Sequence, residues 1–167
     1  MCAFFLVSRE TLKEVNSMKE EYLDMIIKEA LLAAQEGEIP VGALIVRNDE
    51  ILALTHNRKE QMKCSTKHAE IIAIEEASKK INSWRLNDCE IYITMEPCIM
   101  CCGAILQSRI KKINYLVEND KFGGLGNIKD NLGNIKYNHQ VEIEKIKDLK
   151  REKKIRSMLK DFFLNKR

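Results

Sequence analysis

The sequence lacks any apolar run that approaches the roughly 18 residues needed to cross a membrane. Its apolar N-terminus, MCAFFLV, is short and lacks a basic segment, so it is a poor secretory signal. Internal repeats and low-complexity stretches are absent too. With 45% hydrophobic and 32% charged residues in 167, the composition is that of one ordinary soluble domain, expected in the cytoplasm. We predict a weakly structured extension over residues 1–17 and a single domain over 18–167, and Met18 could equally be the natural start.

Without a secretory signal, the six cysteines indicate a reducing compartment. There, thiols serve as metal ligands, nucleophiles or core side chains, and disulfides are the less expected outcome. Cys2, Cys64 and Cys89 have no partner at a ligand spacing, and we interpret them as free thiols.

Acidic residues are scarce at the C-terminal end. Residues 145–167 hold ten lysines and arginines against three acids, a charge of +7 that leaves −4 for the rest of a chain at +3. An isolated basic end favours a polyanionic partner such as nucleic acid. A solvated surface helix explains the same pattern equally well.

Helical and strand-like patterns alternate along the chain, which predicts a layered α/β domain. Two strands are joined by Asn48-Asp49, a hairpin turn, so the sheet should be mixed. Gly37 and Pro40 end the first helix, and Pro97 suits the first turn of a later one. The expected order is helix 18–35, strands 41–47 and 51–57, polar loop 58–66, helix 68–81, strand 89–94, helix 98–107, strand 112–117, surface loop 118–134, strand 141–146 and helix 148–164.

Cys98-x-x-Cys101 is the first chemical motif, and alone it fits a redox dithiol or half of a structural zinc site. A redox pair expects a thioredoxin-like context, whereas here a proline precedes the cysteines. A closed structural zinc site needs four ligands. Only three are evident once His68 is included, because no second CxxC or HxxxH occurs, and three ligands leave the open position of a catalytic zinc.

The spacing supports this grouping. Cys98 and Cys101 share one face of a helical first turn, and His68 begins its own helix. Helix N-termini stabilise thiolates. Cys102 lies about 100° further round and is interpreted as core filler. His56 and His139 lack such context and are expected at a loop or strand end.

Glu70 completes the constellation. Two positions after His68, its carboxylate can face the open metal position without binding the metal. Zinc lowers the pKa of bound water to about 7, and a neighbouring carboxylate can shuttle the proton. Taken alone, Glu70 would be an acid favoured by the helix dipole. Together, H-x-E and a later P-C-x-x-C form the known signature of zinc deaminases.

Beyond that signature, the sequence resembles the bacterial tRNA-specific adenosine deaminases from about Lys19 to Phe163. The zinc motif is specific for the superfamily, and EPCxMC followed by SRI and a terminal DFF is specific for this branch. The resembling segments are 38-EIPVGALIV-46, Asn57-Arg58, 68-HAEIIAI-74, 96-EPCIMCCGAI-105, 108-SRI-110, 138-NHQVEI-143 and 161-DFF-163.

The resemblance implies a three-layer α/β/α cytidine deaminase-like fold with a mixed sheet of about five strands. It also implies conversion of the wobble adenosine of a tRNA anticodon to inosine, by a homodimer with one zinc per subunit. His68, Cys98 and Cys101 would bind zinc, and zinc-bound hydroxide would attack C6. Glu70 would take the water's proton, protonate N1 and help ammonia to leave.

The same resemblance assigns substrate contacts. Asn57 would hydrogen-bond the purine, Pro40 and Val41 would wall the pocket, and the backbone N–H of Ala69 would lie in the site. An amide offers both a donor and an acceptor, as a neutral base edge requires. Pro40 and Val41 are equally the turn from a helix to a strand.

Candidate contacts to the anticodon stem-loop follow from the resemblance as well: Arg58, Asn119, Lys121, Phe162 and Phe163. The two phenylalanines could instead pack the last helix, or one could pack and the other face RNA. Asn119 departs from the family's usual aspartate. We hypothesise that this weakens discrimination against deoxyadenosine, because the loop borders the ribose, whose 2′-OH distinguishes RNA.

Two alternatives remain open at this point. A deaminase of a free base or nucleoside, such as guanine or cytosine, would use the same zinc site, although the basic helix and DFF favour nucleic acid. A non-catalytic, zinc-stabilised RNA-binding module would make Glu70 dispensable.

Overall fold

The computed structural model describes residues 9–126 and 139–165, and it describes side chains from residue 17 onwards. Its elements alternate between helices and strands, as the sequence predicts. In chain order they are α1 (Arg9–Gln35), β1 (Gly42–Arg47), β2 (Glu50–His56), α2 (Ala69–Lys80), β3 (Cys89–Met95), α3 (Ile99–Gln107), β4 (Lys112–Val117), β5 (Glu142–Lys145) and α5 (Leu149–Asn165).

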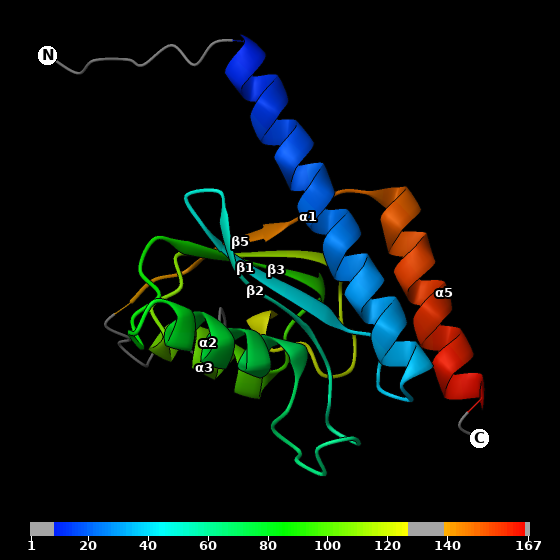
Figure 1. Cartoon of the computed structure of the whole chain (residues 1–167). Helices are drawn as coiled ribbons and strands as arrows, with labels where there is room; N and C mark the ends of the chain where they lie inside the picture. Colours follow the sequence, from blue (N-terminus) through cyan, green and yellow to red (C-terminus); the bar gives the residue numbers. More distant parts are fainter. Residues whose placement is uncertain (1–8, 127–138, 166–167) are drawn as a thin grey trace, which may run out of the picture.

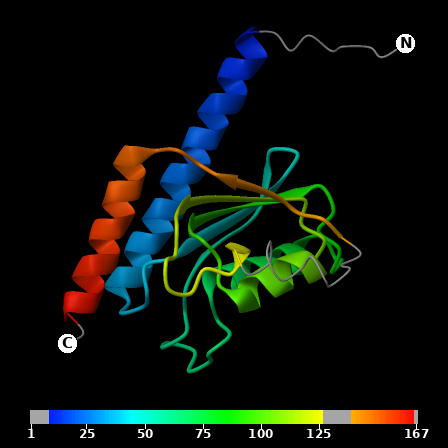
Figure 2. The ribbon, with the colours of Figure 1, turned by 180° about the vertical axis from the view of Figure 1, so that it is seen from behind.

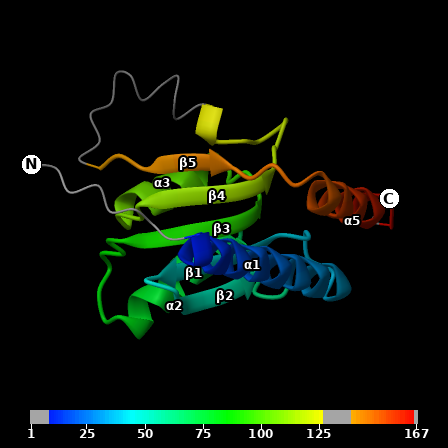
Figure 3. The same ribbon diagram turned by 90° about the horizontal axis from the view of Figure 1, so that it is seen from above.

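The five strands form one mixed sheet in the order β2-β1-β3-β4-β5 (Figure 3). β1 pairs antiparallel with β2 and with β3, whereas β3, β4 and β5 are parallel. The turn of the β1–β2 hairpin has positive φ at both Asn48 (48°) and Asp49 (65°). This is the geometry of a two-residue type I′ turn, so the predicted hairpin is confirmed.

Helices cover both faces of the sheet and make three layers (Figures 1 and 2). α1 and α5 lie side by side on one face, and α2 and α3 lie on the other. The sheet has one hydrophobic core on each face, and adjacent strand residues belong to different cores. Tyr92 belongs to the core that includes Ile26 of α1, whereas Ile91 belongs to the core that includes Ile105 of α3. Burying a large apolar side chain contributes about 1.5–3 kcal/mol. The expected three-layer α/β/α arrangement is therefore confirmed.

The first helix is longer than the sequence suggested. α1 begins at Arg9, whereas we expected a helix from Met18 and a weakly structured segment before it. Residues 9–17 (RETLKEVNS) contain no glycine or proline and include several good helix formers, so nothing in them ends a helix. Residues 1–8, with Cys2, lie outside the described part of the chain.

The first and last helices are joined by one arginine. Arg151 of α5 places its guanidinium 2.5 Å from Glu20 and 2.8 Å from Asp24 of α1. It also lies 2.6 Å from Asp148, three residues before it in the chain. Its side chain is only 17% exposed, so the guanidinium serves the packing of α5 on α1. No described helix is long and apolar enough to cross a membrane.

Candidate active site

Two helix N-termini meet on one face of the sheet. His68 is the N-cap of α2 and Cys98 is the N-cap of α3, both with extended backbone. At both helix starts the positive end of the helix dipole and free N–H groups favour negative charge. Pro97 lies one residue before the cap rather than in the first turn, because Cys98 itself keeps the non-helical conformation of a cap.

His68, Cys98 and Cys101 form a nearly regular triangle of potential ligand atoms. The Nδ1 of His68 lies 3.7 Å from the Sγ of Cys98 and 3.6 Å from that of Cys101. The two sulfurs are 3.6 Å apart. Ligand atoms around a tetrahedral zinc, with Zn–S about 2.3 Å and Zn–N about 2.0–2.1 Å, lie about 3.5–3.8 Å from one another. The triangle therefore has the size of three corners of a zinc tetrahedron.

The two thiols of this triangle titrate as a pair. The hydrogen bond with Cys101, helped by His68, lowers the pKa of Cys98 to about 4, although burial opposes this shift. The same hydrogen bond, together with burial, raises the pKa of Cys101. The pair therefore readily supplies one thiolate, and a divalent cation replacing the shared proton would hold both sulfurs as thiolates.

Glu70 lies in the first turn of α2, two residues after His68, and is 3% exposed. Burial raises the pKa of its carboxyl group. Its Oε2 is a buried polar side-chain atom without a hydrogen-bond partner in the part of the chain that the structure describes. Leaving such an atom unpaired costs about 1–3 kcal/mol, so a ligand or water that supplies a proton is expected there.

Cys102 has different surroundings from its neighbour Cys101. Its side chain is fully buried in the core between the sheet and α2 and α3, and its Sγ donates to the carbonyl oxygen of Pro97 (3.4 Å). Burial raises its pKa to about 12, so it stays a neutral thiol. The placement agrees with core filler, and Cys64 and Cys89 are also free thiols.

Asn57 links three segments of the chain next to His68. Its Oδ1 accepts the backbone N–H of Ala69 (2.8 Å), and its Nδ2 donates to the carbonyl of Ile39 (3.2 Å). One amide hydrogen is thus used, and an asparagine carries two. Pro40 and Val41 are buried beside this contact. The structure brings all four proposed substrate-binding residues together, with the N–H of Ala69 bound to Asn57.

Sequence reasoning missed the role of Glu96. Its carboxylate accepts the backbone N–H groups of Asn119 and Leu125, each at 3.1 Å, so it holds the loop that follows β4. A Cβ on Gly124 would lie 2.7 Å from backbone atoms at the start of α3, so this loop is packed tightly against Cys98. Glu96 precedes the P-C-x-x-C motif in the sequence, and the glycine pair after β4 is the feature that points to this close packing.

The candidate RNA-contacting residues occupy different positions. Arg58 and Lys121 are exposed, and the Oδ1 of Asn119 accepts the N–H of Phe122 (3.1 Å) within its turn. The remaining pair lies on α5: Phe162 is 9% exposed and packs its ring against that of Phe163, which is 51% exposed. Of the basic tail, Lys166 and Arg167 lie outside the described residues.

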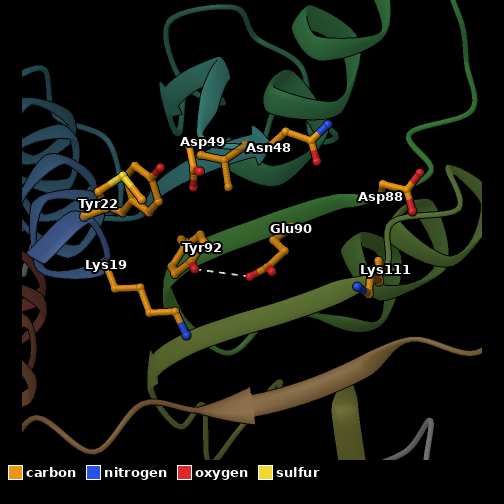
Figure 4. A pocket seen from close by; sticks show the side chains of 10 residues that line it. Lys19, Tyr22, Asn48, Asp49, Asp88, Glu90, Tyr92 and Lys111 are labelled. Atoms are coloured by element: carbon orange, nitrogen blue, oxygen red, sulfur yellow. Dashed lines mark hydrogen bonds between the residues drawn. The ribbon is translucent and has the colours of Figure 1, made fainter. Parts of the chain in front are cut away.

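The other two histidines are not part of the triangle. His56 ends β2, and His139, which precedes β5, places its Nε2 2.6 Å from the carbonyl oxygen of Ile110. A polar hollow of about 300 Å³ includes Asp88, just before β3, and none of the three ligands lines it, whereas Cys98 and Cys101 follow the other end of β3. Figure 4 shows Tyr92 donating to Glu90 inside it. Its lining comprises Met18, Lys19, Tyr22, Val46, Asn48, Asp49, Asp88, Glu90, Tyr92 and Lys111.

The fold is that of a cytidine deaminase-like protein. The chain belongs to the MafB19-like deaminase family, whose family model matches residues 17–167. Among relatives, it is 42% identical over 126 residues to the tRNA-specific adenosine deaminase of Aquifex aeolicus, covering 75% of this chain and 83% of that protein.

Solved structures show two kinds of deaminase on this fold. A structure from a study of A-to-I editing by tRNA:A34 deaminases at the wobble position is 26% identical, with a TM-score of 0.76 over 84% of this chain and 99% of that one. A guanine deaminase from Bacillus subtilis is 28% identical, with a TM-score of 0.60 over 78% of this chain and 87% of that one.

Proposed function

We propose that this protein is a zinc-dependent deaminase that hydrolyses adenosine to inosine at the wobble position of a tRNA anticodon. One observation carries the chemistry: a His-Cys-Cys triangle of the size that zinc requires lies beside a buried carboxylate with an unpaired oxygen. The tRNA substrate is supported by relatives 38–42% identical over most of the chain. We further propose that residues 18–167 act as a single domain.

His68, Cys98 and Cys101 would hold the metal. The donor set is one imidazole and two thiolates, a combination found in catalytic zinc sites that keep one position open. When bound, zinc polarises a water molecule and lowers its pKa to about 7. The dipoles of α2 and α3 support the two thiolates, so the chain itself contributes to the charge balance of the site.

Glu70 would carry the protons. Hydrolysis adds water to C6 of adenine, breaks the exocyclic C–N bond and releases ammonia. Glu70 would accept the proton of the attacking water, deliver it to N1, and then transfer the second proton to the departing amine. Its burial favours a carboxyl that alternates between the two protonation states, because the charged form is not strongly hydrated.

Asn57 would orient the base. Its remaining amide hydrogen and the nearby backbone offer hydrogen bonds to the purine, and Pro40 and Val41 would form an apolar wall against the ring. The base reaches this site only when it is flipped out of the anticodon loop, which costs little in a single-stranded loop.

The RNA would contact a basic and aromatic surface. α5 exposes Lys153, Lys154, Arg156 and Lys160, and its end exposes Phe163. Phosphates would pair with the lysines and arginines, and an unstacked base could stack on the exposed ring. Arg58 and Lys121 add positive charge on the two loops beside the metal site.

Asn119 bears on the choice between RNA and DNA. Because its Oδ1 already accepts the N–H of Phe122, its free amide group is the part that could face a ribose. We propose weaker discrimination against deoxyadenosine than in relatives with aspartate. The test compares deamination rates on RNA and DNA hairpins of one sequence, and an unchanged preference in Asn119→Asp would contradict it.

Inosine mapping on total tRNA treated with the purified protein tests the main proposal. Inosine should appear at the wobble position of one or more tRNAs, and ammonia release from free adenosine, cytosine and guanine should be far slower. The similarity to a guanine deaminase makes free guanine the informative competitor. Faster release from a free base than from tRNA would replace the proposed substrate.

Two further properties follow from the resemblance and remain proposals. A homodimer is supported by exposed apolar side chains near the site, Met62 (51%) and Ile99 (61%), and light scattering would determine its mass. A cytoplasmic location fits the tRNA substrate and the free thiols.

A further inference from the structure

His56, the last residue of β2, is enclosed by two carboxylates: Glu29 of α1, and Glu36, the residue that follows α1. Its Nδ1 lies 2.5 Å from the Oε2 of Glu29, and its Nε2 lies 3.1 Å from the Oε2 of Glu36. The His56 side chain is 5% exposed, Glu29 is 16% exposed and Glu36 is 42% exposed. The two glutamates are seven residues apart, and the N–H of Glu36 bonds to the carbonyl oxygen of Leu32 (3.0 Å), which keeps Glu36 on the side of Glu29.

Each ring nitrogen of His56 has one carboxylate oxygen as its partner. Carboxylate oxygens accept hydrogen bonds, and an imidazole carries at least one N–H that can donate. The two contacts therefore hold the ring from both of its nitrogens.

His56 and Asn57 are adjacent in the chain, and their side chains lie on opposite faces of the sheet. Side chains of successive strand residues point to opposite faces of a sheet. His56 accordingly reaches α1 on one face, while Asn57 reaches the N–H of Ala69 in α2 on the other. The ring thus fixes the backbone from which the Asn57 amide extends into the candidate site.

α1, which carries Glu29, packs closely against the sheet beside His56. His56 pairs with Gly42 across the β1–β2 ladder. A Cβ on Gly42 would lie 2.1 Å from the carbonyl oxygen of Ile26, so α1 touches the sheet at this pair. In such close packing, loss of the ring cannot be absorbed by a small shift of α1.

We propose that His56 is a positioning residue for deamination, which acts through Asn57: Glu29 and Glu36 hold the His56 ring, and the ring sets where the Asn57 amide meets the base. This role rests on the proposed function of Asn57 in the site. On this proposal α1, which lies on the other face of the sheet, also takes part in orienting the substrate.

A double-mutant cycle tests the coupling. His56→Asn should lower kcat/KM on tRNA about tenfold, since small misplacements of an orienting group are costly. Zinc content should not change. In an Asn57→Asp background, which keeps the acceptor for Ala69, the same substitution should change kcat/KM less than about twofold. Equal effects in both backgrounds would overturn the proposal.

His139→Asn is the matched control, because it removes a histidine whose ring contacts the carbonyl oxygen of Ile110 rather than α1 or Asn57. It should leave kcat/KM within about twofold of the parent enzyme. A loss equal to that of His56→Asn would assign the effect to general stability and overturn the coupling.

The enclosure of the ring is tested on the unmodified protein, so this test does not depend on a variant that folds. In ¹H–¹⁵N spectra a His56 ring N–H should exchange slowly with solvent, because both ring nitrogens face carboxylates and the side chain is 5% exposed. Rapid exchange of the ring N–H would overturn the proposal. The chain has three histidines, and single substitutions assign them. Absence of deamination on tRNA would remove the proposed function, whereas this spectrum would still report on the contacts of His56.

Discussion

Cys101 and Cys102 are adjacent in the chain but differ in what surrounds them. Cys101 faces His68 and Cys98, and Cys102 faces Pro97 and the apolar core. A helical step of about 100° is enough to separate a ligand from a packing residue. The difference predicts opposite consequences for the same kind of substitution.

Cys101→Ser should lose zinc, because a hydroxyl is a poor zinc ligand and only two strong ligands remain. Cys102→Ala should keep zinc but lower the free energy of unfolding by about 1 kcal/mol or more, because it leaves a small cavity. Metal analysis and urea unfolding measure the two effects. Zinc loss in the Cys102 variant would contradict the assignment.

Glu70 tests catalysis separately from metal binding. Glu70→Gln keeps the size of the side chain but removes proton transfer, so kcat should fall about 10²–10⁴-fold. Zinc content should stay at the parent level. Glu70→Asp, which keeps a carboxylate at a shorter reach, serves as the comparison and should retain more activity. Full activity in Glu70→Gln would favour a module that only binds RNA.

At the scale of elements, the spacing of apolar residues and the positions of turn-forming and helix-ending residues predicted most of the helices and strands. Asn48-Asp49 predicted a hairpin because both residues tolerate positive φ, and 112–117 matches β4 at both ends. The early start of α1 was not predicted, although residues 9–17 have good helix propensity and contain no residue that ends a helix. The triangle of ligands was predicted from spacing and the named resemblance. The contacts of Glu96 and His56 depend on which elements the fold brings together, and local sequence does not contain that information.

Two glycine substitutions test how tightly the loop after β4 packs against the start of α3. Gly124→Ala should push the loop or the start of α3 aside, and we expect a loss of about 1–3 kcal/mol in stability with reduced zinc affinity. Gly126→Ala is the control, since a Cβ there meets no atom of the described residues within 4 Å. Thermal unfolding and zinc titration of both variants make the comparison, and equal behaviour would contradict it.

At the scale of the whole molecule, α1 and α5 form one outer layer although they lie at opposite ends of the chain (Figure 1). Arg151 links them through Glu20 and Asp24, and Ile155 is buried in the core that α1 covers. The proposed RNA surface on α5 is therefore supported by the same helix that holds His56.

Arg151→Ala should weaken the packing of α5 on α1 and lower the free energy of unfolding. Isolated surface pairs contribute about 0–1 kcal/mol, but a network of three carboxylates on one largely covered guanidinium should contribute more. Arg156→Ala, which loses a single exposed pair with Glu152, is the control. Urea unfolding should show the larger loss for Arg151→Ala.

The pH dependence of that loss has a defined sign. Hydrogen bonds from Arg151 lower the pKa of Asp148 below its ordinary 3.8. A lowered folded-state pKa gives stability that is present above the unfolded-state value and is lost as pH falls through the folded-state value. The difference between parent and Arg151→Ala should therefore shrink below about pH 4, and a difference that grows there would contradict the network.

All three ligands of the candidate metal site lie between residues 68 and 101, so they are synthesised before β4, β5 and α5. A ribosome adding about 5–20 residues per second therefore exposes His68, Cys98 and Cys101 seconds before the last helix is complete. Zinc captured at that stage would fix α2 against α3 while β4 and β5, two of the five strands of the mixed sheet, are still missing. The order of synthesis would thus allow metal capture early in biogenesis and complete the proposed RNA surface last.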